Sequence, residues 1–267
     1  MKLSLLGTIF LSEKRMDLLL LLIKGPMNIE EIKNTLNVTT SAMMTQIKVL
    51  IDQGLIIYDN DFYRLSLFGE VIVRKMVPLV NTLKVYSDNL EYWENHKFNS
   101  IPTYLQDRVE ELGECELIEP DLNRMYELPI KLETNLEKAE YILEVSAYFS
   151  PAYPSKYLEL ARKGVNISLI ISAPVFERLK NEYSSVLEEF FEAENVDIYV
   201  HPDTIGLASC IVTDKSLSIS LFFKNGMYHN HAMMSFNQKS LDWGKDLFEY
   251  FKSNSTFCKN SSFVEHA

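Results

Sequence analysis

Hydrophobic and polar positions near the start of the chain predict two helices joined by a tight turn and followed by a two-stranded hairpin. Asn28 is a helix-capping residue, and Glu31 follows it at the spacing of a capping box. Thr39 caps the next helix, whose apolar positions recur at helical spacing until Gly54 ends it. Two short apolar and aromatic runs then flank Asp59-Asn60-Asp61, which is typical of a hairpin.

This order of elements is the outline of a winged helix-turn-helix, whose second helix enters the DNA major groove. On a helical wheel, the helix after Thr39 has one apolar face that would pack on the preceding helices, made of Met43, Ile47, Leu50 and Ile51. The opposite face, the helix start and one hairpin position supply the predicted DNA-binding residues: Thr39, Thr40, Ser41, Met44, Thr45, Lys48 and Arg64. The reading face lacks Arg and Asn, so the sequence predicts DNA binding without predicting an operator.

A hydrophobic repeat follows the hairpin. Its members alternate spacings of four and three, as in a heptad seam: Ile72, Met76, Leu79, Leu83, Tyr86, Leu90 and Trp93. Two interpretations stand side by side, an amphipathic helix packed within its own domain and a homodimerisation helix over residues 70–97. Pro78 lies inside the repeat and predicts a kink or a restart of the helix at that point.

Beyond the linker candidate Asn99-Ser100-Ile101-Pro102, strand-like and helical runs alternate. The strand-like runs are Tyr141–Val145, Val165–Ile171, Val196–Val200, Cys210–Thr213 and Leu217–Phe223. Helical runs between several of them predict an α/β domain with parallel strands, so the fold class is α/β plus all-α. The predicted organisation is a winged helix over residues 1–69, a long linker or dimerisation helix over 70–100, a regulatory α/β domain over 101–253 and a flexible tail over 254–267.

Charge is distributed unevenly along the 267 residues. Residues 1–75 contain 9 Lys or Arg and 8 Asp or Glu, a net charge of +1, whereas residues 76–267 contain 17 and 29, a net charge of −12. Phosphate would repel the acidic part, which should therefore face away from DNA. The three cysteines are widely spaced, and no apolar run is long enough to span a bilayer, so we expect a cytoplasmic protein without a membrane segment.

Several segments together carry a family resemblance: SEKRMDLLLLL, the predicted helix-turn-helix, VIVRKMVPLVNTLKVYSDNLEYWENHKFNSIP, KGVNISLIIS and LDWGKDLFEYFKS. In order and spacing they resemble archaeal regulators found chiefly in methanogens, in which an ArsR-like winged helix precedes a methanogenesis-regulatory domain. The resemblance covers nearly the whole chain. It implies a phospholipase D-like α/β fold for the second domain, and dimeric transcription factors that act on genes of energy metabolism.

Phospholipase D-like folds raise the alternative of a hydrolase, whose motif would be His-x-Lys-x4-Asp. The corresponding stretch here is CIVTDKSLSISLF, which keeps Asp214-Lys215 but has no His two residues before the lysine. Covalent phosphoryl transfer would lack its nucleophile. We therefore expect no catalytic residues, no enzyme activity and no cofactor, and the second domain would be a degenerate member of that fold.

Strand ends in the second domain predict a pocket for a small-molecule effector. In open α/β sheets, ligands bind beyond the carboxyl ends of the strands, which places five polar residues near such a pocket: Ser146, Tyr148, Ser172, His201 and Asp214. His229-Asn230-His231 has two histidines on one side of an extended segment, but no nearby carboxylate or cysteine completes a metal site. We expect no bound metal.

These observations favour a transcription regulator that binds double-stranded operator DNA through the winged helix and carries a sensing domain. An adaptor that uses the winged helix to bind another protein is the alternative, because helix-turn-helix patterns occur in both classes. The dependence of DNA affinity on salt separates the two.

Overall fold

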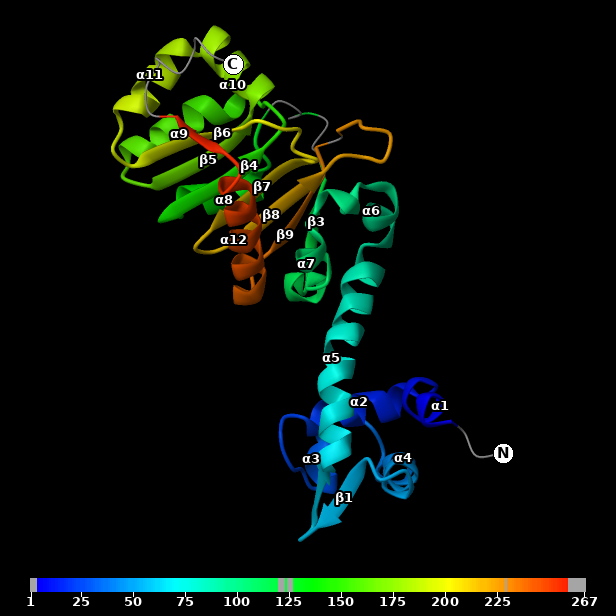
Figure 1. The fold of residues 1–267 in the computed structure, drawn as a ribbon. Helices are drawn as coiled ribbons and strands as arrows, with labels where there is room; N and C mark the ends of the chain where they lie inside the picture. The colour runs from blue at the N-terminus through cyan, green and yellow to red at the C-terminus, as the bar shows by residue number, and fades with distance from the viewer. Residues whose placement is uncertain (1–3, 120–122, 124–126, 229, 259–267) are drawn as a thin grey trace. The chain divides into compact units, whose positions relative to one another are not determined.

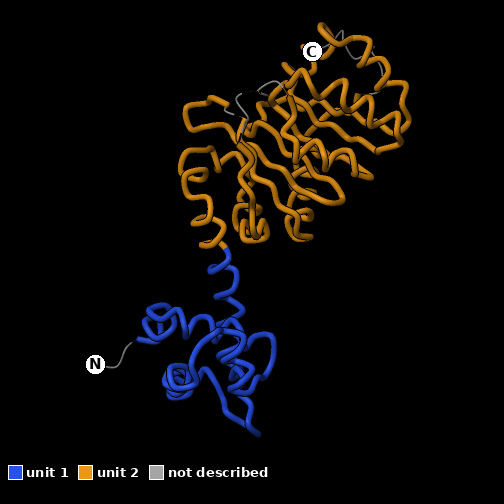
Figure 2. The backbone as a smooth tube through the Cα atoms, turned by 180° about the vertical axis from the view of Figure 1, so that it is seen from behind, with its two compact units in different colours: residues 1–81 blue, residues 82–267 orange. Residues whose placement is uncertain are grey.

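The structure, a computed structural model, describes residues 4–119, 123, 127–228 and 230–258. The chain divides into two compact units, residues 1–81 (unit 1) and residues 82–267 (unit 2), which Figure 2 shows in two colours. The boundary falls within a helix, whereas the sequence placed it at the end of the hairpin. Each unit has its own hydrophobic core.

Unit 1 consists of short helices, a hairpin and the beginning of a long helix. The elements are α1 (Leu5–Phe10), α2 (Glu13–Leu22), α3 (Ile29–Leu36), α4 (Thr40–Asp52), β1 (Ile56–Asp59), β2 (Phe62–Leu65) and α5 (Leu67–Asp88). Their core includes Leu18 from α2, Ile32 from α3 and Met43 from α4, each fully buried. Helical spacing of the apolar side chains gives each of these helices one buried face.

Capping groups set the bounds of α3 and α4. Asn28 Oδ1 accepts from the Glu31 N–H at 3.0 Å, and a Glu31 carboxylate oxygen accepts from the Asn28 N–H at 2.8 Å, so the predicted capping box is confirmed. Asn37 ends α3 in the left-handed conformation with φ of 50°. Thr39 Oγ1 then accepts from the Ala42 N–H at 3.3 Å and begins α4. The turn between the helices is therefore specified locally.

Helix α5 runs through Pro78 without the restart that was one of the two predicted outcomes there. The break falls at Asn89 instead, and α6 (Leu90–Asn95) follows as a separate helix. Trp93 is buried in the core of unit 2, and its Nε1 donates to the Val85 carbonyl at 2.9 Å. The last two positions of the predicted heptad seam therefore belong to a second helix.

An eight-stranded mixed sheet forms the centre of unit 2, in the order β10-β6-β5-β4-β7-β8-β9-β3. The strands are β3 (Glu116–Ile118), β4 (Tyr141–Ser146), β5 (Asn166–Ser172), β6 (Val196–His201), β7 (Leu207–Thr213), β8 (Leu217–Leu221), β9 (Ala232–Ser235) and β10 (Thr256–Cys258). Only β4, β5 and β6 are parallel neighbours, and every other pair is antiparallel. Crossover helices connect the parallel strands, whereas a short turn joins β7 to β8 and forces them to be antiparallel.

Three of these strands were missed in the sequence, namely β3, β9 and β10. Each has three or four residues, too few for a period-two pattern to stand out. Strand β10 lies in the stretch expected to be a flexible tail, where Thr256 to Cys258 pair with β6. Pairing with an existing strand edge, rather than local sequence, orders this segment.

Helices cover both faces of the sheet in unit 2 (Figure 1). One face packs on α8 (Ile130–Glu137), α9 (Ala152–Arg162), α10 (Ala173–Glu182) and α11 (Ser184–Glu192). The other packs on α6, α7 (Thr103–Gln106) and α12 (Gln238–Lys252). Alternate residues of β4 therefore join different cores, with Ile142 on the first side and Val145 on the second.

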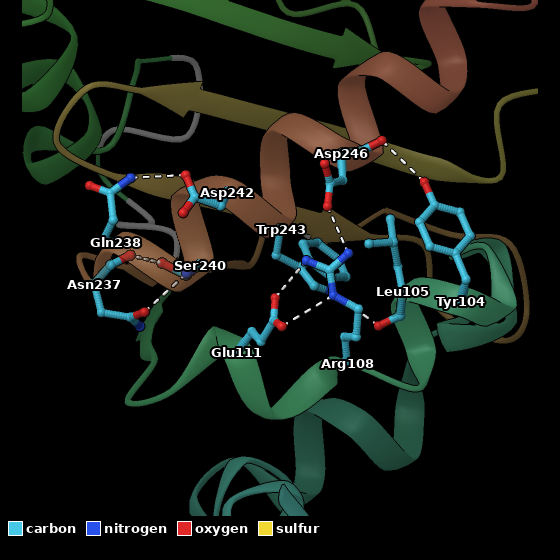
Figure 3. A network of polar contacts seen from close by, with 10 residues as sticks. All are labelled: Tyr104, Leu105, Arg108, Glu111, Asn237, Gln238, Ser240, Asp242, Trp243 and Asp246. Carbon is cyan, nitrogen blue, oxygen red and sulfur yellow. Dashed lines mark hydrogen bonds and ion pairs between the residues drawn. The ribbon is translucent and has the colours of Figure 1, made fainter.

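A polar network holds the α7 segment against α12 (Figure 3). The guanidinium of Arg108 contacts Asp246 at 2.7 Å and Glu111 at 2.8 Å. Beneath it, Nε1 of the fully buried Trp243 donates to the Leu105 carbonyl at 2.9 Å. These contacts fix the segment that leads into the sheet domain.

Replacing Trp243 tests this contact. We expect Trp243→Phe to lower the free energy of unfolding by about 2–4 kcal/mol, because the Leu105 carbonyl loses its buried donor and a cavity replaces part of the indole. Chemical denaturation followed by circular dichroism measures the change. Tyr250→Phe, on the exposed side of α12, is the control and should change stability by less than about 0.5 kcal/mol. Equal effects of the two variants would contradict a structural role for Trp243.

Candidate nucleic-acid interface and ligand cavity

Helix α4 in unit 1 has one buried and one exposed face. Met43, Ile47 and Leu50 are at most 1% exposed and pack in the core of unit 1. The predicted DNA-contacting residues of α4 and its cap are all exposed: Thr39, Thr40, Ser41, Met44, Thr45 and Lys48. Helix α4 thus exposes to solvent a largely polar face with a single cation, Lys48.

The start of α4 offers hydrogen-bond donors. The Thr39 hydroxyl oxygen accepts a hydrogen bond from the Ala42 N–H, and the Thr45 hydroxyl donates to the Ser41 carbonyl at 3.2 Å. The N–H groups of Thr40 and Ser41 precede the first hydrogen bond of the helix, which the Met43 N–H donates to the Thr39 carbonyl. Such a helix start, flanked by the hydroxyls of Thr40 and Ser41, has the chemistry that binds a phosphate.

Two tyrosines missed in the sequence share this surface. Tyr58 and Tyr63 pair across the hairpin with ring centroids 4.8 Å apart, and they line an open hollow with Ser41, Met44, Thr45 and Lys48. The Tyr63 hydroxyl lies 3.5 Å from the Met44 sulfur. Alternation along residues 62–65 could have shown that Tyr63 points to the same side as the core residue Leu65.

Arg64 and Ile51 lie apart from the groups in which the α4 residues fall. Arg64 is exposed on the hairpin, as predicted for a wing position, and lies on the other side of β2 from Tyr63, beside Pro26 and Glu70. Its contact with DNA stays a prediction. Ile51 was expected in the buried face of α4, yet it is 38% exposed and lines the hollow.

The hairpin tip is acidic. Asp59 and Asp61 are exposed there, and the Asp61 carboxylate accepts a hydrogen bond of 2.8 Å from Tyr58. Carboxylates repel phosphate, so the tip opposes contacts with a DNA backbone while the start of α4 favours them.

In unit 2 the structure brings together four of the five predicted effector residues. Ser146, Ser172 and His201 lie at the carboxyl ends of the parallel strands β4, β5 and β6, and Tyr148 follows β4. His201 Nδ1 lies 3.1 Å from the Ser255 hydroxyl, so this ring nitrogen already has a hydrogen-bond partner within the protein. Ser146 and Tyr148 line a cavity.

Asp214 lies at the opposite end of the strands, in the middle of the sheet. It follows β7 beside the start of β4, where its carboxylate accepts from the Glu140 N–H at 2.9 Å. Lys215 Nζ lies 3.2 Å from that carboxylate and also donates to the Lys138 carbonyl. Asp214 and Lys215 link the loops at this end of the strands because β7 is antiparallel to β4, whereas the sequence prediction assumed parallel strands.

The cavity contains Glu144, which the sequence analysis missed. This β4 residue is 4% exposed, and its carboxylate accepts a hydrogen bond from the Tyr157 hydroxyl. Burial raises the pKa of Glu144 to about 7, while hydrogen bonds from Tyr157 and Ser146 lower it. The signal was present in the sequence, since Glu144 interrupts an otherwise apolar strand.

Metal chemistry finds no support among the residues that the structure describes, where no three His, Cys, Asp or Glu side chains are placed to hold an ion. His229 lies outside the described residues, so the predicted His229-Asn230-His231 turn is not described as a whole. Cys115 and Cys210 are free thiols. Among the described helices, none is long and apolar enough to cross a bilayer.

Comparisons with known proteins match both parts of the chain. Residues 4–84 match a family described as "Methanogenesis regulatory protein FilR1, N-terminal domain", and residues 125–254 match its middle domain. A curated relative, methanogenesis regulatory protein FilR1 of Methanothrix harundinacea (strain 6Ac), is 22% identical over 249 residues. These matches support an archaeal regulator. The alignment covers 91% of this chain but only 56% of the relative, so this chain spans about half of that protein's length.

Solved structures are similar at a lower level. One is TrmBL2, described as an archaeal chromatin protein with a novel mode of DNA binding, with 14% identity and a TM-score of 0.44 over 92% of this chain and 94% of that chain. Another is Nuc from Salmonella typhimurium, a phospholipase D family member, with 11% identity and a TM-score of 0.40 over 55% of this chain and all of that chain. Neither likeness is close enough to assign a function.

Burial of Glu144 makes stability depend on pH. A carboxyl group with a raised pKa in the folded state favours folding below its unfolded pKa, and this contribution is lost as pH rises through about 7. We expect the free energy of unfolding of Glu144→Gln, relative to that of the wild type, to increase by about 2–3 kcal/mol as pH rises from 5 to 8. Denaturant unfolding at both pH values measures the difference. A difference that stays constant over this range would contradict the raised pKa.

Proposed function

We propose that this chain is a transcription regulator that binds double-stranded operator DNA through a winged helix in unit 1. The main support is α4, which buries Met43, Ile47 and Leu50 and leaves Ser41, Thr45 and Lys48 exposed beside a hairpin. An exposed second helix with polar groups at its start is the arrangement that such proteins place in the major groove. The similarity to a methanogenesis regulatory protein supports the regulatory role.

Genes of methanogenesis and energy metabolism are the proposed targets, and the proposal rests on the names of the matching family. Unit 2 would supply regulation. Its acidic charge disfavours contact with DNA, and it contains the cavity around Glu144. A small-molecule effector in this cavity is therefore part of the proposal.

A protein-binding adaptor is the second candidate, and a specific observation favours it. The hollow beside α4 has apolar and aromatic walls, with Met44, Ile51 and Tyr58 all more than a third exposed. Aromatic residues and Met are enriched in protein interfaces, and the acidic hairpin tip would not hinder a protein partner. DNA binding and protein binding would then compete for the same surface.

Charge reversal at Lys48 tests DNA binding. We expect Lys48→Glu to weaken binding of the full chain to DNA from its own promoter by at least about tenfold, because a phosphate contact becomes a repulsion. Mobility shifts over a range of salt concentrations measure the affinity. The slope of log K against log salt should decrease in magnitude by about one, because one phosphate contact is lost.

Lys75→Glu is the matched control, because it makes the same charge change at an exposed position of α5. It should leave the affinity within about threefold of the wild type. Absence of measurable DNA binding by the wild type would favour the adaptor, and equal losses in both variants would remove α4 as the DNA-binding surface.

Homodimerisation through residues 70–97 is also proposed, to match a two-fold operator. Leu79, Leu83 and Tyr86 of α5 are 49%, 55% and 45% exposed, and they keep the four-and-three spacing of a coiled-coil seam. Met76 and Trp93 are buried within their own units, which limits the free seam to the middle of the repeat.

A charge in the middle of this seam tests dimerisation. Leu83→Glu should convert a dimer into a monomer, since paired seams would bury two carboxylates. Light scattering coupled to size-exclusion chromatography measures the mass. Ser87→Glu on the same helix is the control and should remain dimeric. A monomeric wild type at micromolar concentration, or a dimeric Leu83→Glu variant, would contradict the proposal.

A further inference from the structure

The cavity in unit 2 joins a buried carboxylate to a group of aromatic rings. Its volume is about 50 Å³, and it lies between α9 and the carboxyl ends of β4 and β5. Glu144 and Ser146 line it from β4, and the aromatic side chains of Tyr148, Phe149, Tyr153 and Tyr157 also line it. This volume admits about three or four groups of the size of a water molecule or a methyl group.

The carboxylate of Glu144 lacks a compensating positive charge. Among the described residues, no cationic side chain pairs with it. Lys156 is on α9 near the cavity, but its Nζ contacts Glu133 at 3.1 Å and Glu137 at 2.6 Å instead. A buried carboxylate without a cation is costly when it is ionised, so a cationic ligand would gain a strong and poorly screened attraction.

Aromatic rings on the same cavity add a second source of attraction. Tyr153 and Tyr157 on α9 have ring centroids 5.4 Å apart. The Tyr148 ring is tilted against the Tyr228 ring, with centroids 4.2 Å apart, and Tyr148 is 40% exposed, so it lies where the cavity meets solvent. The electron-rich faces of such rings attract ammonium groups, and the attraction reaches about 2 kcal/mol when the site excludes water.

We propose that this cavity is a binding site for a small alkylammonium ion, with Glu144 as its counter-ion and the tyrosines as its walls. Methyl groups on the nitrogen would contact the rings of Tyr153 and Tyr157 and the apolar side chains of β5. A neutral molecule of the same size would gain only the apolar contacts, and an anion would be repelled. Charge and small size therefore define the ligand class.

The inference rests on the proposed sensing role of unit 2, but it does not depend on DNA binding. Binding of the ion is measured on the full chain without DNA. A failure to bind the ion would leave the DNA-binding proposal intact, and a failure to bind DNA would leave this site intact.

Isothermal titration calorimetry with trimethylammonium chloride tests the site, with tert-butanol as a neutral probe of similar size and sodium acetate as the anion. We expect saturable binding of trimethylammonium at millimolar or lower concentration, and no binding of the other two. Glu144→Gln should weaken this binding by about tenfold or more, because the ion pair is lost. Its circular dichroism spectrum and melting curve show whether it is folded.

Glu133→Gln is the control variant, since it removes a carboxylate of α8 that contacts Lys156 and does not line the cavity. It should bind trimethylammonium like the wild type. Tyr153→Leu should weaken binding while keeping an apolar wall. Equal binding of tert-butanol, undiminished binding by folded Glu144→Gln, or no binding of trimethylammonium by the wild type would each overturn the proposal.

The pH dependence gives an independent readout. The affinity for trimethylammonium should fall as pH drops below 7, since protonation of Glu144 removes its charge. The other titratable groups around Glu144 are the hydroxyls of Tyr153, Tyr157, Tyr148 and Tyr228 and the thiol of Cys210. Burial raises the pKa of Tyr228 to about 12 and also raises the pKa values of Tyr153, Tyr157 and Cys210, so these groups stay neutral. An affinity that is constant between pH 6 and pH 8 would contradict the role of Glu144.

Discussion

Burial of the central strands on both faces is the constraint on which unit 2 depends. Strand β4 lies between β5 and β7 in the middle of the sheet, and helices cover it on either side. Almost every residue of such a strand must be apolar, because neither face meets water. The run from Tyr141 to Ser146 follows this rule except where Glu144 and Ser146 stand, and those two residues line the cavity. The departure from the packing rule and the candidate site coincide.

The same constraint accounts for the chemistry of Glu144. A carboxyl group on a covered strand cannot reach bulk water, so the protein stabilises it with the Tyr157 hydroxyl and a shift of its pKa towards 7. Natural proteins tend to break packing rules at functional sites, where the stability lost is offset by a ligand or a reaction.

Unit 1 follows a simpler logic, because one-sided burial of short helices suffices. The side chains of Ile32, Met43 and Leu50 fill its core, and the residues between them on α4 are left to the solvent. Packing constrains only the buried face of α4, so the residues on its exposed face can be chosen for recognition of a partner. Polar groups at the helix start suit DNA, while the tyrosines of the hairpin add apolar area that suits either partner.

Local chemistry in the sequence determined much of this protein. The capping box of Asn28 and Glu31, the cap at Thr39 and the spacing of Met43, Ile47 and Leu50 predicted unit 1, because each depends on residues a few positions apart. The apolar runs of β4, β5 and β6 were found for the same reason. Only the tertiary structure decided the strand order, the antiparallel course of β7, and the pairing of β10 with β6, which join residues far apart in the chain. The tertiary structure also places Asp214 at the opposite end of the strands from Ser146 and Tyr148. It surrounds Glu144 with aromatic rings of α9, because the packing of α9 on β4 joins segments whose contact the sequence does not show.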